Sequence, residues 1–241
     1  MIIYGKNAVV ESLRAEKAIF KIYLLDRFEN KAGEVELLAK RRNTKIKYAT
    51  KVELRSLCGD DHHQGFVAEM EDFSYCELED ILSLANSKHQ QPFVVLLDGV
   101  EDPHNLGSIV RVCECAGVHG IIIPKHNACP INSTVSKTSA GALSNMKIAR
   151  VANLSQAVAK LKKEGLWVYA VELGGENIYR TNLKGALALV IGSEGEGVGE
   201  LLKKRCDGIV TLPMAGNINS LNASVAAGIA IYEAVRQRGD T

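Results

Sequence analysis

Residues 208–238 read GIVTLPMAGNINSLNASVAAGIAIYEAVRQR, and this stretch predicts a strand, a loop and a helix in succession. The apolar run at 208–212 is typical of a buried strand, and a proline follows it. Ser220, Asn222 and Ser224 favour a helix start, because their side-chain oxygens accept hydrogen bonds from unpaired backbone N–H groups. Three such side chains exceed what one cap requires. We therefore expect a polar site where strand, loop and helix meet.

Similar apolar runs precede this stretch and predict a buried sheet. They lie at 93–97, 121–123, 167–171 and 186–191, with a shorter candidate at 147–151. Helical patterns separate them, for example at 154–164. Strands that alternate with helices predict an α/β fold with a largely parallel sheet and helices on both faces. Ligands of such sheets bind beyond the carboxyl ends of the strands, so the residues after each strand become the site candidates.

The first seventy residues predict a separate, smaller α/β unit. We expect helices at 6–14, 32–42 and 51–57, and strands at 19–25, 45–48 and 65–70. The polar run at 86–92 marks a shift in composition, which is typical of a domain boundary. We therefore expect an N-terminal domain at 1–72, a linker at 73–91 and a second domain at 92–241.

Composition limits the classes of protein that this chain can represent. No apolar run of its 241 residues approaches the roughly 20 residues that span a bilayer, and the N-terminus lacks the order of a signal peptide. We therefore expect a cytoplasmic protein with reduced cysteines and no membrane contact. The six cysteines form no C-x-x-C pair, so we expect no metal site; Cys113 and Cys115 are interpreted as small buried side chains.

Charge gives one local signal. The net charge of +1 is uninformative, but KRRNTKIK at 40–47 concentrates positive charge. Such segments bind phosphate backbones or are simply solvated surface, and both interpretations stay open.

The first strand-end motif is DGVEDPHNLGSIVR at 98–111. A helix that begins near Asn105 would bury one apolar stripe, made of Leu106, Ile109, Val110, Cys113 and Ala116. Ser108 and Arg111 would then share the accessible face. The alternative is that Asn105 is an ordinary N-cap and Arg111 a surface arginine.

The second motif is GSEGEGVG at 192–199, directly after an apolar strand. Glycines there allow a ligand to approach the backbone closely, although a flexible turn is the alternative. The spacing matches neither a dinucleotide fingerprint nor a P-loop, and Glu194 and Glu196 would repel a pyrophosphate. A ligand that carries positive charge is compatible. With no obvious His or Cys nucleophile, the three motifs suit binding and orienting more than covalent catalysis.

These motifs, in this order, resemble the SpoU (TrmH) family of RNA ribose methyltransferases in the SPOUT superfamily. The matching segments are DPHNLGSIVRVCECAGVHGIIIP (102–124), LALVIGSEGEGV (187–198) and LPMAGNINSLNASVAAGIAIYEAVRQR (212–238). YGKNAVVESL (4–13) and HHQGFVAEM (62–70) are similar to the ends of the family's ribosomal-protein-like RNA-binding domain. This two-domain form is similar to bacterial enzymes that methylate a guanosine ribose in 23S rRNA.

The resemblance implies an activity and a set of site residues. It implies S-adenosylmethionine as methyl donor, 2′-hydroxyl methylation, a deep trefoil knot in the C-terminal domain and a homodimer formed through that domain. Carried over by position, the catalytic residues would be Asn105, Arg111, Glu194, Ser220 and Asn222. The cofactor-binding residues would be Gly192, Leu212, Met214, Gly216 and Leu221. Lys40, Arg41, Arg42 and Lys45 become expected rRNA contacts. Two alternatives remain: the same chemistry on tRNA or another rRNA nucleotide, and an RNA-binding assembly factor without catalysis.

Overall fold

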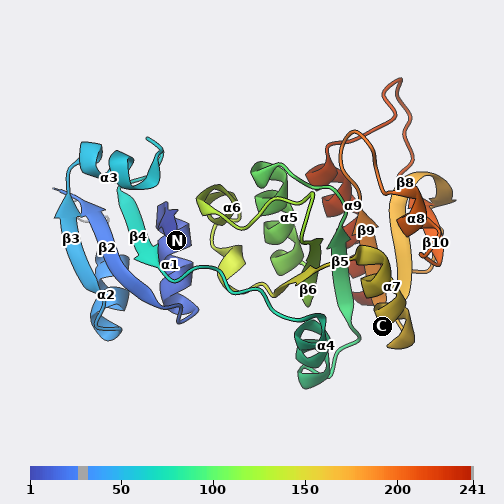
Figure 1. The fold of residues 1–241 in the computed structure, drawn as a ribbon, viewed down its shortest axis with the longest axis horizontal. Helices are drawn as coiled ribbons and strands as arrows, with labels where there is room; N and C mark the ends of the chain where they lie inside the picture. The colour runs from blue at the N-terminus through green and yellow to red at the C-terminus, as the bar shows by residue number, and fades with distance from the viewer. Residues whose placement is uncertain (27–31, 240–241) are drawn as a thin grey trace. The chain divides into compact units, whose positions relative to one another are not determined.

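The computed structural model describes residues 1–26 and 32–239, which form two compact units (Figure 1). One unit comprises residues 1–74 together with 130–145, and the other comprises residues 75–129 and 146–241. The domain boundaries expected from sequence did not place residues 130–145 with the N-terminal residues. The segment holds helix α6 Ser133–Thr138 and the short helix η1 Ala142–Ser144.

The first unit is built on a mixed four-stranded sheet. Its strands, in the order β1-β4-β2-β3, are β1 Ile2–Tyr4, β2 Ile19–Leu25, β3 Lys45–Ala49 and β4 Phe66–Met70. Its other helices are α1 Lys6–Arg14, α2 Gly33–Arg41 and α3 Lys51–Cys58. The elements predicted between residues 6 and 70 are confirmed to within one residue at each end. Strand β1 was not predicted, because three residues are too few to show a period of two.

The second unit is built on a six-stranded sheet in which every neighbouring pair is parallel, as predicted. Its strands, in the order β10-β8-β9-β5-β6-β7, are β5 Phe93–Leu97, β6 Gly120–Pro124, β7 Ile148–Val151, β8 Trp167–Asn177, β9 Leu187–Ile191 and β10 Gly208–Thr211. All five residues of β5 and of β9 are buried, because helices cover both faces of the sheet.

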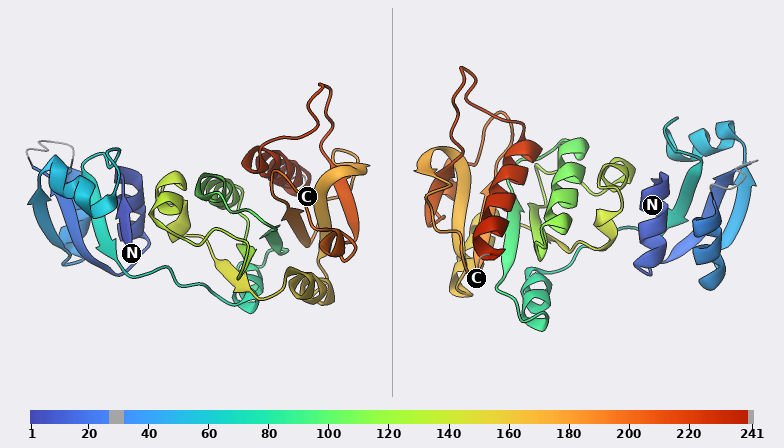
Figure 2. Two further views of the ribbon diagram at one scale, coloured as in Figure 1. Left: turned by 45° about the horizontal axis from the view of Figure 1, so that its top comes forward. Right: turned by 180° about the vertical axis from the view of Figure 1, so that it is seen from behind.

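Helices α4 Leu78–Ser87 and α7 Leu154–Lys163 pack on one face of this sheet, where Ile81 and Val158 join its core. Helices α5 Pro103–Cys115 and α9 Ala223–Gly239 lie side by side on the other face (Figure 2). Helix α8 Glu200–Lys203 follows the second motif. The predicted buried stripe of α5 is confirmed at Leu106, Ile109, Val110 and Cys113. Cys115 was expected to be buried but is exposed, since it lies two residues from Cys113 and faces away.

Strand β8 is longer than predicted, because its last residues pair with β10. Val210 lies opposite Glu176 and Thr211 opposite Asn177, after a register shift in β10. The extension carries the chain past the carboxyl ends of the central strands. None of the helices in the described residues is long and apolar enough to cross a membrane.

Candidate active site

Three side chains from the three motifs meet in one hydrogen-bonded cluster at the carboxyl end of the six-stranded sheet. Asn105 Nδ2 donates to Glu194 Oε1 at 2.7 Å. Asn222 Nδ2 donates to Asn105 Oδ1 at 2.9 Å and to Glu194 Oε1 at 2.5 Å. The structure thus brings together three of the five predicted catalytic residues, one from α5, one from the loop after β9 and one from the start of α9.

Asn222 is held from both ends of its amide. Its Oδ1 caps α9 by accepting from the backbone N–H groups of Ser224 (3.0 Å) and Val225 (3.3 Å) and from the Ser224 hydroxyl (2.6 Å). Its Nδ2 makes the two bonds to Asn105 and Glu194 described above. This arrangement explains two of the three capping residues in the sequence. Asn222 caps the helix, and the Ser224 hydroxyl donates to the capping oxygen.

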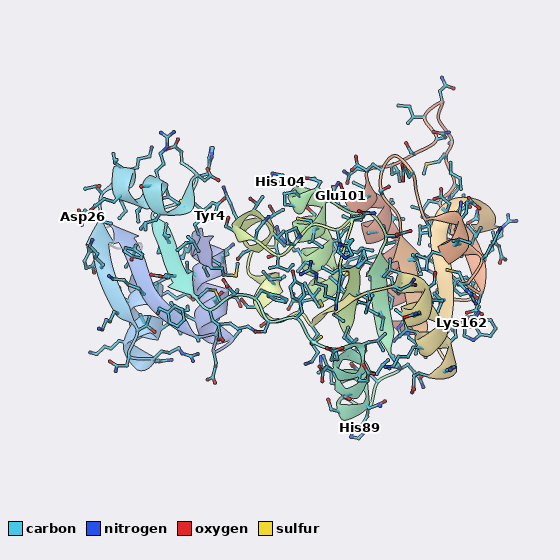
Figure 3. The ribbon with its side chains drawn as sticks, in the orientation of Figure 1. Tyr4, Asp26, His89, Glu101, His104 and Lys162 are labelled. Atoms are coloured by element: carbon cyan, nitrogen blue, oxygen red, sulfur yellow. The ribbon has the colours of Figure 1, made fainter. Side chains whose placement is uncertain are left out.

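Helix α5 begins two residues earlier than predicted. Asp102 is its N-cap and accepts from the backbone N–H groups of His104 (3.3 Å) and Asn105 (3.1 Å), while Pro103 occupies the first helical position. Glu101 and His104, on either side of this cap and its proline, mark the start of α5 in Figure 3. The interpretation of Asn105 as an ordinary N-cap is therefore wrong, and its amide is available to bind Glu194.

A cavity of about 350 Å³ opens beside Glu194. Four of the five predicted cofactor residues line it, namely Gly192, Leu212, Met214 and Leu221, while Gly216 does not. Ser220 lines it as well. Glu172 and Lys203 were not predicted to take part, yet both lie in its wall. Glu172 follows the apolar run at 167–171, so the rule that selects residues after each strand could have found it.

The glycine motif forms a tight turn that a carboxylate secures. Ser193 and Gly197 exchange backbone hydrogen bonds of 3.2 and 3.1 Å, and Gly197 has a φ of 66°. Glu172 Oε2 accepts from the Val198 N–H at 2.9 Å, and a Cβ on Gly197 would collide with this carboxylate. The backbone conformation at 197 thus favours glycine, and a larger residue there would also displace the Glu172 carboxylate.

The remaining predicted residues make no hydrogen bond to this cluster within the part of the chain that the structure describes. Arg111 is exposed on α5, and its side chain has no hydrogen bond or ion pair within residues 1–26 and 32–239. In the first unit, Lys40 and Arg41 are exposed in the last turn of α2. Arg42 Nη1 donates to the Leu13 carbonyl at 2.9 Å, and Lys45 is exposed on β3. The basic segment at 40–47 is therefore divided between a helix end and a strand.

The cavity residues fit S-adenosylmethionine, a cofactor with apolar parts and a cationic sulfur. Leu212, Met214 and Leu221 supply apolar wall. Glu172, Glu194 and Glu196 supply three carboxylates against one ammonium group, Lys203. This balance favours a cation, and the volume lies within the roughly 300–1,000 Å³ of small-molecule sites.

Comparison with known proteins identifies both units. The model described as SpoU rRNA Methylase family matches residues 92–232, and the one described as RNA 2'-O ribose methyltransferase substrate binding matches residues 2–76. The chain is 42% identical over 239 residues to a putative TrmH family tRNA/rRNA methyltransferase, YacO, of Bacillus subtilis, covering 98% of this chain and 95% of the relative. It is 37% identical to the 23S rRNA (guanosine-2'-O-)-methyltransferase RlmB of Ralstonia nicotianae, covering 98% and 96%.

A solved structure agrees with the fold. The SpoU methyltransferase AviRb from Streptomyces viridochromogenes, in complex with AdoMet, superimposes with a TM-score of 0.82 at 25% identity, covering 98% of this chain and 89% of that one. The predicted family, fold and enzyme class are confirmed. The chain belongs to the SpoU rRNA methylase family, the S-adenosylmethionine-dependent RNA ribose 2′-O-methyltransferases.

Proposed function

We propose that this enzyme methylates the ribose 2′-hydroxyl of a guanosine in 23S rRNA. The observation that carries the proposal is whole-chain similarity, across both units, to a relative named for that reaction. A second candidate is the same chemistry on tRNA, which the tRNA/rRNA name of the Bacillus subtilis relative favours. The match of residues 2–76 to a substrate-binding family of RNA ribose methyltransferases supports an RNA substrate in either case.

In this proposal the four predicted residues that line the cavity, Gly192, Leu212, Met214 and Leu221, hold S-adenosylmethionine. When bound, the cofactor supplies an activated methyl group on a cationic sulfur. Glu194 lies at the junction of the cavity and the Asn105–Asn222 pair, so its carboxylate favours a cation on the cavity side. The hydrogen bonds from both amides hold that carboxylate in place, which is the kind of preorganisation that positions a reacting group.

We assign Arg111 to the ribose oxygen or to a neighbouring phosphate. An arginine side chain has a pKa above about 12, so it suits the stabilisation of developing negative charge better than proton removal. Ser220 and Asn222 lie at the start of α9, and the N-terminus of a helix favours a phosphate. Because the Asn222 amide is fully engaged, we give the phosphate contact to the Ser220 hydroxyl and the positioning of Asn105 and Glu194 to Asn222.

We also propose that the enzyme is a homodimer that acts in the cytoplasm, where rRNA is modified. Supporting the dimer, α9 exposes an apolar stripe at helical spacing, made of Val225, Ile229 and Tyr232. These residues follow directly after the catalytic cluster, so a partner docked there would lie close to the site. The trefoil knot expected from the family stays a prediction.

The decisive experiment maps 2′-O-methylated nucleotides in rRNA and tRNA from cells with and without this protein. We expect one guanosine of 23S rRNA to lose its methyl group in the deletion strain and regain it when the wild-type protein is restored. Complementation with Asn105→Ala should fail, because that variant loses the cluster. Loss of a tRNA methyl group with unchanged rRNA would instead establish the second candidate.

A further inference from the structure

Three lysines lie together on one face of the four-stranded sheet in the first unit. Lys21 of β2 is paired in register with Lys45 of β3, and Tyr23 is paired with Lys47. Side chains alternate across a strand, so these four odd-numbered positions share one face. The even-numbered neighbours Ile22 and Leu24 are fully buried on the opposite face. Lys45 and Lys47 are exposed and Lys21 is half-buried.

Helix α3 covers only part of this face. Its Leu54 packs with Tyr4, Ala49 and Val67, and the half-buried Leu25 and Tyr23 lie against the same cluster. These residues are at the ends of β2 and β3 that α3 contacts, so the beginnings of both strands, with their lysines, stay accessible. Figure 3 labels Tyr4 in this unit. The result is a small exposed sheet surface whose side chains are mostly basic.

The repulsion among the lysines is offset only in part by their neighbours. Lys21 and Lys45 are directly opposite each other, and like charges in that position destabilise a sheet. Lys21 is also opposite Glu69 on β4, and Lys47 lies near enough to lower the pKa of Glu53, but none of the three lysines forms an ion pair within the described residues. Other basic groups of this unit do pair: Arg14 binds Glu34 and Lys137 binds Asp60. An anionic ligand would remove the repulsion.

Protection of a sheet edge is the competing explanation, because lysines on edge strands discourage aggregation. It accounts for Lys45 and Lys47, since β3 is an edge strand. It does not account for Lys21, because β2 lies between β4 and β3. The Lys21 ammonium also lies 5.3 Å from the centroid of the Tyr23 ring. A basic groove with an aromatic ring is the combination that single-stranded RNA binds by phosphate contact and stacking.

We infer that the face formed by Lys21, Tyr23, Lys45 and Lys47 binds the sugar–phosphate backbone of the RNA substrate. Residues two apart on a strand are about 6.6 Å apart and neighbouring strands about 4.8 Å, a spacing comparable with that of consecutive phosphates. The inference rests on an RNA substrate, as in the proposed function. It replaces the continuous 40–47 segment with a surface that keeps Lys45 and Lys47, adds Lys21 and Tyr23, and leaves out Lys40, Arg41 and Arg42.

Two matched double variants, each replacing one pair of basic residues, test this surface in the full-length protein. Lys45→Gln/Lys47→Gln removes two charges from the sheet face, and Lys40→Gln/Arg41→Gln removes two charges from the end of α2. All four side chains are exposed, so both proteins should fold, which circular dichroism and thermal melting check. Neutral glutamines also avoid a new ion pair with Lys21.

Affinity for deproteinised 23S rRNA is then measured over a series of KCl concentrations. The sheet-face pair should weaken binding about tenfold or more. It should also reduce the slope of log Kd against log [KCl] by about 1.4 to 1.8, since each lost phosphate contact contributes roughly 0.7 to 0.9. The helix-end pair should stay within about twofold of wild type, and Kd for S-adenosylmethionine should be unchanged in both. Glu69→Lys should tighten RNA binding.

Equal weakening by the two pairs would show a diffuse electrostatic effect and overturn the inference, as would no weakening by either. These outcomes are separable from failure of the proposed function, because binding is measured without methylation. If 23S rRNA is not the methylated RNA, the same comparison is made on tRNA. The inference about the surface is then tested by the difference in RNA affinity between the two double variants.

Discussion

Asn222 illustrates, at the scale of one residue, how a single side chain serves both the fold and the site. Its oxygen caps α9 and its nitrogen donates to Asn105 and Glu194. Asn222→Asp separates the two roles, because a carboxylate oxygen still caps the helix while both N–H donors are lost. The new carboxylate would also face Glu194.

We expect Asn222→Asp to lower kcat/KM about 10- to 100-fold, as a hydrogen bond to a charged group is worth roughly 1.5–3 kcal/mol. Its thermal midpoint should stay near that of wild type. Asn222→Ala should lose activity and also about 0.5–2 kcal/mol of stability with the cap. Single-turnover methylation and thermal melting distinguish the variants, and full activity in Asn222→Asp would contradict the role of the cluster.

Arg111 permits a second test at this scale, between stabilisation of charge and proton removal. Lysine keeps the positive charge but loses the planar fork of donors, so Arg111→Lys should methylate more slowly at every pH. The measurement is the pH profile of kcat from pH 6 to 11. An activity that rises as the lysine deprotonates, up to nearly the wild-type rate, would show instead that the group at position 111 acts as a base.

At the scale of elements, the glycine turn after β9 depends on a residue of β8. A methyl group at position 197 would meet the Glu172 carboxylate, and Gly197 also has a positive φ. Gly195 has open space around its Cβ position, which makes Gly195→Ala a matched control in the same turn.

We therefore expect Gly197→Ala to weaken binding of S-adenosylmethionine at least tenfold, because the left-handed backbone at 197 disfavours a Cβ and the added methyl group displaces the Glu172 carboxylate from the Val198 N–H. Gly195→Ala should bind within about threefold of wild type. Isothermal titration calorimetry measures both. Equal binding by the two variants would show that the turn does not shape the cavity.

His119, which precedes β6, makes the stability of the second unit depend on pH. Its Nδ1 accepts from the Phe93 N–H at 3.0 Å and its Nε2 lies 3.1 Å from Gln90 Oε1, an arrangement suited to the neutral ring. Burial lowers the pKa of His119 below its ordinary value of 6.5, and Lys88 and Arg238 lower it further. The unfolded chain therefore binds a proton more readily, so stability that is present above pH 6.5 is lost as the pH falls through the folded pKa.

We expect the free energy of unfolding to decrease from pH 6.5 to pH 5, by up to about 1.4 kcal/mol per unit of difference in pKa. Urea titrations followed by fluorescence of Trp167, the single tryptophan, report on the second unit. His119→Asn should be less stable overall but less sensitive to pH. The exposed His89→Asn is the control, and the same pH slope in both variants would rule out His119 as the source.

At the scale of the whole molecule, the apolar stripe of α9 tests the proposed homodimer. Ile229→Glu places a charge in the middle of Val225, Ile229 and Tyr232, which would be desolvated in a dimer. Light scattering after size exclusion should show a dimer for wild type and a monomer for Ile229→Glu. Leu201→Glu alters an exposed leucine on α8, outside the stripe, and should stay dimeric. A monomeric wild type would reject the proposal.

The sequence by itself determined most of the helices and strands, the parallel order of the larger sheet and the motifs that hold the site residues, but not β1 or the extension of β8. Apolar runs and helical spacing report how each element is buried, and that information is local. The positions of Asn105, Glu194 and Asn222 at strand or helix ends followed from the same patterns.

Only the tertiary structure decided which of these groups touch. Asn105 contacts Glu194, 89 residues away in the sequence, and Asn222, 117 residues away. No local sequence pattern encodes such contacts. The same holds for Glu172 beneath the glycine turn and for Arg42, whose guanidinium binds a backbone carbonyl of its own unit. It holds as well for residues 130–145, which group with the first unit. A side chain's partners depend on the packing of segments distant in sequence, whereas its tendency to be buried depends mainly on its neighbours in the chain.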